Sequence, residues 1–203
     1  MLLVPLVLAS GAASQELDPR AYTPVPTGGN VLIAAYTYQT GDVLLDPSLP
    51  ITDLSAKLSI ATLGYARTFS FLGRYANASV GIPGAHLFAE GNVFEERQTR
   101  TRTGLGDARA KLAVNLLGAH ALAPPEFART RPATVLGVSL TVSAPTGQYS
   151  SDRLVNLGAN RWAFKPEVGV SHPIGRWLLD AYAGVWLFTP NHDFYGGVTR
   201  TQD

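Results

Sequence analysis

Hydrophobic and polar side chains alternate one by one along several stretches of this chain. In residues 107–116 the odd positions include Asp107, Arg109, Lys111 and Asn115, whereas the even positions hold only Ala, Leu and Val. A strand places alternate side chains on opposite faces, but a helix would bring Arg109 among the apolar side chains. The stretch is therefore predicted to be a strand with one charged and one apolar face. The same alternation predicts strands over 76–82, 134–144, 162–172 and 177–187.

Two earlier stretches, 30–39 and 57–69, are rich in β-forming residues but alternate less regularly, and we expect them to be strands as well. Several of the predicted strands are about eleven residues long, which is the length at which a tilted strand crosses a bilayer.

Long and short connections alternate between these strands. The long ones are polar or rich in Pro and Gly, namely 40–56, 89–104 and 145–160, whereas 70–74 and 173–176 are tight. Outer-membrane barrels have short periplasmic turns and longer external loops. The pattern therefore predicts an all-β fold, an antiparallel transmembrane β-barrel of the outer-membrane type with about seven strands present.

The apolar face of such a barrel meets lipid, so the polar positions point into a water-filled lumen. A charge at Ala113, on the lumen face, should be tolerated if the lumen has room. The lumen charges either pair across strands or form a selectivity ring. A soluble, lipocalin-like barrel that binds a ligand would instead invert the two faces. The predicted lumen residues are Asn77, Ser79, Asp107, Arg109, Lys111, Asn115, Ser139, Thr141, Ser143, Lys165, Glu167, Asp180 and Tyr182.

Aromatic residues gather near the ends of the predicted strands. Outer-membrane barrels carry aromatic girdles at both membrane interfaces. Ordinary core packing would account for each ring singly, but not for this grouping. We therefore expect a girdle made of Tyr65, Phe69, Tyr75, Trp162, Trp177, Trp186 and Phe188.

The composition argues against several classes of function. The net charge is +1, so no strong field favours a nucleic-acid partner. The chain has no cysteine, which excludes a disulfide framework or a thiolate metal site. The basic run at 96–102 is expected to be a solvated loop, or else a contact for lipopolysaccharide phosphates.

The two ends of the chain suggest export and a longer barrel. Residues 1–14 are predicted to be a signal peptide that lacks its basic first part, although a buried N-terminal strand is the alternative. Residues 15–29 are then a periplasmic segment and 30–203 the barrel. Because single-chain bacterial barrels have an even number of strands, seven strands predict a barrel that continues beyond residue 203.

No catalytic or cofactor-binding constellation emerges from the sequence. The four histidines are far apart and form no metal-ligand pattern, so no cofactor or metal is expected. An outer-membrane lipid-modifying enzyme is the alternative to a channel. The loose candidates for its active site are Ser150, Ser151, Asp152, His192 and Asp193.

Two motifs, GDARAKLAVNLLGA at 106–119 and SAPTGQY…NLGANRWAFKPEVG at 143–169, carry a family resemblance. From about residue 18 onward the chain resembles the outer-membrane transporter family labelled "putative meta-pathway of phenol degradation". The resemblance implies an outer-membrane β-barrel without enzymatic activity that admits small hydrophobic or aromatic compounds. Its implied partners are outer-membrane lipid and lipopolysaccharide, the permeant, and the barrel-assembly machinery.

Overall fold

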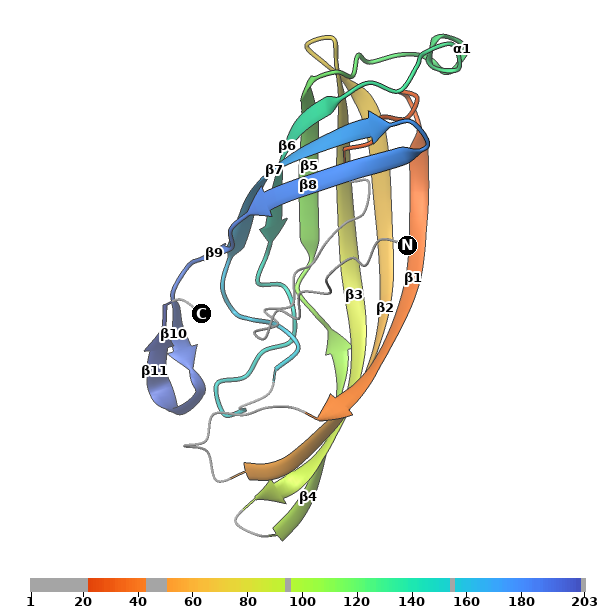
Figure 1. Cartoon of the computed structure of the whole chain (residues 1–203). Coiled ribbons are helices and arrows are strands. Elements are labelled where there is room, and N and C mark those ends of the chain that lie inside the picture. The colour runs from red at the N-terminus through yellow and green to blue at the C-terminus, as the bar shows by residue number, and fades with distance from the viewer. Residues whose placement is uncertain (1–21, 43–50, 94–95, 154–155, 202–203) are drawn as a thin grey trace, which may run out of the picture.

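The computed structural model describes residues 22–42, 51–93, 96–153 and 156–201, and most of them belong to one large antiparallel sheet. Figure 1 shows that this sheet is strongly curved, like part of a barrel wall. The predicted all-β antiparallel fold is confirmed. The main path of the sheet runs, neighbour to neighbour, through β1 (Asn30–Asp42), β2 (Ile51–Phe71), β3 (Arg74–Val93), β5 (Arg109–Leu117), β6 (Val135–Ser143), β7 (Ala163–Ile174) and β8 (Trp177–Gly184).

One long strand, β3, pairs with two different strands along the same edge. Its first half pairs with β5, and its second half pairs with β4 (Glu96–Leu105). The prediction of a loop over 89–104 is therefore wrong, because β3 and β4 form a hairpin there. β4 is polar on both faces, so it lacks the alternation that predicts the other strands. The connection predicted over 40–56 is likewise shorter, because β1 extends to Asp42 and β2 begins at Ile51.

Two tight hairpins lie at one end of the sheet. Leu72 and Gly73 connect β2 to β3, and both have a positive φ, 51° and 75°, as a two-residue type I′ turn requires. Gly175, with φ 59°, opens the equally short turn between β7 and β8. The third connection at this end, 118–134, is longer and contains α1 (Pro124–Phe127).

The last predicted strand, 177–187, is interrupted. β8 ends at Gly184, and β7 then pairs with the short β9 (Leu187–Phe188). Pro166 lies on β7 between these two pairings, and proline has no N–H to donate to a sheet. Beyond β9, a small hairpin of β10 (Asn191–Phe194) and β11 (Val198–Arg200) encloses a 3₁₀ turn, Tyr195–Gly197.

No helix in the described residues is long and apolar enough to cross a membrane. The signal peptide predicted for residues 1–14 lies outside the described residues.

Candidate functional site

The register of the sheet brings the predicted lumen residues together on one face, which we call the polar face. Residues that pair directly across neighbouring strands lie on the same face of a sheet. Ser79, Lys111, Thr141 and Lys165 form one such row across four strands. The other rows contain Asn77, Ser139 and Glu167; Arg109 and Ser143; Asn115 and Tyr182; and Asp180. That these residues line a channel stays a prediction.

The opposite face, which we call the apolar face, exposes large hydrophobic side chains. Leu63 is 71% exposed, and Leu112 and Leu140, which pair with each other, are 49% and 43% exposed. A continuous exposed apolar surface of this kind is unusual on a soluble monomer and suits contact with lipid.

The segment before β1 folds back onto the polar face. Tyr22 is completely buried, and its ring packs against that of Tyr182 with centroids 5.8 Å apart. Its hydroxyl lies 3.1 Å from Ser139 Oγ and donates to Glu167 Oε1 at 3.1 Å, while Asn115 Nδ2 donates to its carbonyl oxygen. Residues 22–29, predicted to be part of a periplasmic segment, thus pack against the sheet.

Two glycines make room for the Tyr22 ring. A Cβ at Gly137 or Gly169 would overlap it, so the Tyr22 ring requires glycine at these places on β6 and β7. Burial raises the pKa of Tyr22 to about 12, and the negative charge of Glu167 acts in the same direction. The phenol is therefore neutral at physiological pH and remains a hydrogen-bond donor.

Charged and aromatic side chains lie side by side on the polar face. Lys165 Nζ is 3.1 Å from Glu167 Oε2, and both side chains are largely buried. The guanidinium of Arg109 and the ammonium of Lys165 each lie 5.9 Å from the centre of the Trp186 ring. The predicted lumen charges thus include one ion pair along a single strand and two cations near the Trp186 ring.

Asp107 is the one predicted lumen residue outside the strands. It lies in the break between β4 and β5, and its two carboxylate oxygens accept hydrogen bonds from Gly147 N and Ala159 N, both at 2.8 Å. Its carboxylate is engaged by the backbone between β6 and β7.

The predicted girdle aromatics divide between the two faces. Tyr75 packs in the buried cluster around Tyr22, the Trp186 ring faces polar-face cations, and Phe188 pairs with Ala163 of the polar face. The girdle prediction is corrected for these three residues, because a girdle needs rings directed at lipid. The other four lie on the apolar face. Tyr65, Phe69 and Trp177 are placed there by the register of their strands, and the Trp162 ring stacks on that of Phe164.

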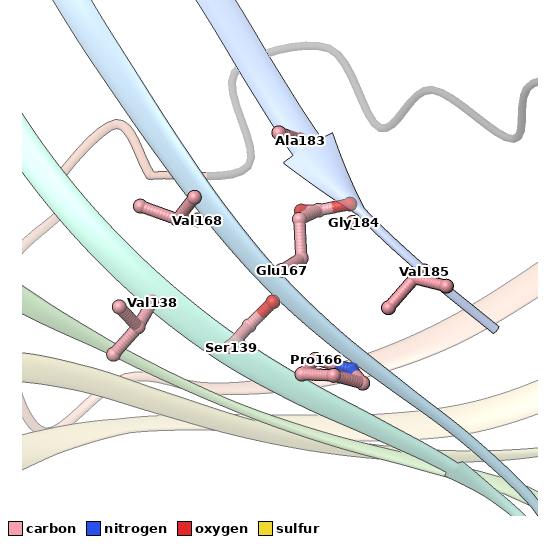
Figure 2. A pocket seen from close by; sticks show the side chains of 8 residues that line it. All are labelled: Val138, Ser139, Pro166, Glu167, Val168, Ala183, Gly184 and Val185. Atoms are coloured by element: carbon pink, nitrogen blue, oxygen red, sulfur yellow. The ribbon is translucent and has the colours of Figure 1, made fainter. Parts of the chain in front are cut away.

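A shallow pocket lies where the pairing of β7 with β8 ends (Figure 2). Its polar lining comes from Ser139 and Glu167, beside the point where β8 ends at Gly184. Its apolar lining comes from Val138, Pro166, Val168, Ala183 and Val185.

The described residues contain no group of three His, Asp or Glu side chains that could hold a metal ion. Among the loose enzyme candidates, the Ser150 backbone is bound by the Asn156 side chain, and the Asp193 carbonyl accepts a hydrogen bond from Tyr149. Both residues thus take part in the structure of the loops.

Comparison with known proteins gives a solved structure and a family. The structure is that of an outer membrane channel from Pseudomonas putida F1. It matches this chain with a TM-score of 0.69 and 20% sequence identity, and the match covers 93% of this chain and 67% of the Pseudomonas chain. A search of curated proteins found no match. The fold is therefore that of an outer-membrane channel. The model of the family described as "Putative MetA-pathway of phenol degradation" matches residues 24–203, and the chain belongs to this family.

Proposed function

We propose that the protein is a channel of the bacterial outer membrane through which small hydrophobic or aromatic molecules diffuse passively. The observation that carries this proposal is the contrast between the two faces of the curved sheet. One face exposes large apolar side chains, such as Leu63 and Leu112, and the other gathers charges and hydroxyl groups. A soluble barrel with a ligand cavity would carry its apolar side chains on the inside.

The family and the structural similarity support the choice of permeant and location. The family description names phenol degradation, and the similar structure is an outer membrane channel. Aromatic rings beside cations on the polar face, such as Phe188 with Arg161 at 4.2 Å, offer surfaces on which an aromatic permeant can stack.

The test compares cells that contain the protein with cells that lack it. We expect the protein to require detergent for extraction, and the uptake of a labelled monoaromatic compound to depend on it. A sugar of similar size serves as the control solute and should enter much more slowly. Recovery of the protein in the periplasm without detergent, or uptake of the aromatic compound at the same rate in both strains, contradicts the proposal.

A further inference from the structure

The connection between β6 and β7, residues 144–162, is tied to the wall of the sheet by Asp107. The carboxylate of this residue binds both legs of the loop, since Oδ1 accepts from Gly147 N and Oδ2 from Ala159 N. Hydrogen bonds to an ionised acceptor are about twice as strong as neutral ones. A single side chain in the wall therefore holds the two legs of the loop together.

Backbone hydrogen bonds reinforce the same junction. Gln148 N donates to Leu105 O at 2.9 Å, and Ala144 N donates to Ala108 O at 2.9 Å. Ala108 N in turn donates to Thr146 Oγ1 at 2.9 Å. The loop is thus attached on both sides of Asp107.

Glycines allow the close approach of the two legs. A Cβ at Gly147 would lie 2.7 Å from the carbonyl carbon of Gly106, and a Cβ at Gly158 would lie 2.7 Å from that of Gly147. Neither position can hold a side chain without moving the backbone. These glycines and Asp107 belong to the two motifs that carry the family resemblance.

Hydrogen bonds also connect the described residues of the loop with one another. The Asn156 side chain binds the backbone of Ser150 and the carbonyl of Arg153, and Gly158 N donates to Gln148 O. Asn191, beyond β9, binds both Tyr149 Oη and Ala159 O. The loop is held as one unit and is not a freely moving strand connection.

The loop lies over the polar face. The Gln148 carboxamide occupies the space into which a Cβ at Gly104 would project. Gly104 pairs with Ala85, which lies on the same face of β3 as Asn77 and Ser79. In Figure 1 the loop, in teal and cyan, runs beside the junction of β4 and β5.

We propose that the described parts of this loop, residues 144–153 and 156–162, form a fixed constriction of the passage and that Asp107 is the positioning residue that sets the width of the passage. This inference rests on the proposed channel function. Because the loop is pinned at its base and its Gln148 side chain covers the polar face at Gly104, the molecules that pass are selected by size where Gln148 narrows the passage.

The test uses protein extracted with detergent from the outer membranes of cells that produce it, not residues 15–203 expressed alone. It measures single-channel conductance in planar bilayers and the size cutoff for neutral sugars in liposomes. Asp107→Ala should increase the conductance and shift the cutoff to larger sugars. Gly158→Ala keeps the carboxylate but forces the loop away from it, so it should produce the same shift. Asp152→Ala removes an exposed carboxylate from the tip of the same loop and should retain the wild-type values.

Only variants that keep a heat-modifiable band on a semi-native gel are compared, so that loss of folding is not mistaken for a wider passage. If folded Asp107→Ala and Gly158→Ala both retain the wild-type conductance and cutoff, the constriction proposal is overturned while the channel proposal stands. If the wild-type protein itself conducts no ions and admits no solute, the channel proposal is contradicted, and the constriction proposal falls with it.

Discussion

Neighbouring residues on one strand face two different surroundings. Leu140 is 43% exposed and pairs with Leu112 and Pro166 on the apolar face, whereas Thr141, the next residue of β6, lies between Lys111 and Lys165 on the polar face. The same change of side chain at these two positions therefore probes the two faces separately.

Glutamate should destabilise the protein at position 140 but not at position 141. Arg or Lys at the lipid face of a barrel costs about 2–4 kcal/mol near the membrane midplane and Glu costs less, so we expect Leu140→Glu to cost about 1–2 kcal/mol. Thr141→Glu brings a negative charge between two lysines and should leave the free energy of unfolding unchanged or raise it. Urea unfolding in lipid vesicles measures both, and equal losses would show that the two faces have been assigned wrongly.

Sequence alternation separates the same two groups of side chains as the register of the sheet does, but it cannot show what covers them. It placed Ala113 on the lumen face, where a charge was expected to be tolerated if there was room. The side chain is only 2% exposed and packs in the cluster around Tyr22. Tyr22 lies 93 residues before Asn115, its hydrogen-bonding partner in that cluster, and no local pattern predicts so distant a contact.

Tyr22 should make the attachment of its segment sensitive to high pH. The pKa of the phenol is raised from 10.0 to about 12 in the folded protein, so the folded state favours the neutral form. Its contribution to stability is complete below pH 10 and is lost as the pH rises through 12. We expect residues 22–29 to detach over this range and the conductance to rise.

Tyr22→Phe is the control for this titration, because it keeps the ring and removes the ionisable group. Its conductance should change much less between pH 10 and pH 12. An equal rise in both proteins would mean that other groups cause it.

At the scale of elements, alternation reveals a strand only where the two faces meet different surroundings. On the apolar face of β3, Val80 and Ile82 are followed by a mixture of polar and apolar residues, His86, Phe88 and Glu90. A strand of 20 residues is about twice the length that crosses a bilayer, so its distal half stands in water. The alternation therefore predicts a strand at 76–82 but gives no sign of the β3–β4 hairpin.

The turn between β2 and β3 holds a residue that is poorly suited to its conformation. Leu72 has φ 51° and is 89% exposed, although a Cβ makes left-handed conformations costly and type I′ turns favour Asn before Gly. Leu72→Asn should therefore raise the free energy of unfolding by about 0.5–1 kcal/mol. Leu72→Val, with a β-branched side chain, should lower it. The urea midpoints of the two variants check this, and the reverse order would exclude strain at this turn.

At the scale of the whole molecule, the sheet is an open path. In the described residues β1 pairs only with β2, at one end of the path, and β8 pairs only with β7, at the other. Each of these two strands therefore has one side without a partner in the sheet. The long strands and the register are sufficient to build a curved wall, but closure depends on pairing at both edges.

Residues 15–203 expressed alone should therefore not form a closed monomeric barrel. In hydrocarbon each unpaired backbone N–H or C=O costs several kcal/mol, so a membrane sheet must close on itself. Exposed edges also recruit other chains and favour aggregation. Mobility on a semi-native gel, boiled against unboiled, checks this. The similar Pseudomonas putida channel, whose chain extends beyond the part matched here, is the control that should shift on heating. A compact, heat-shifted band from residues 15–203 would show instead that β1 and β8 can pair with each other and close the wall.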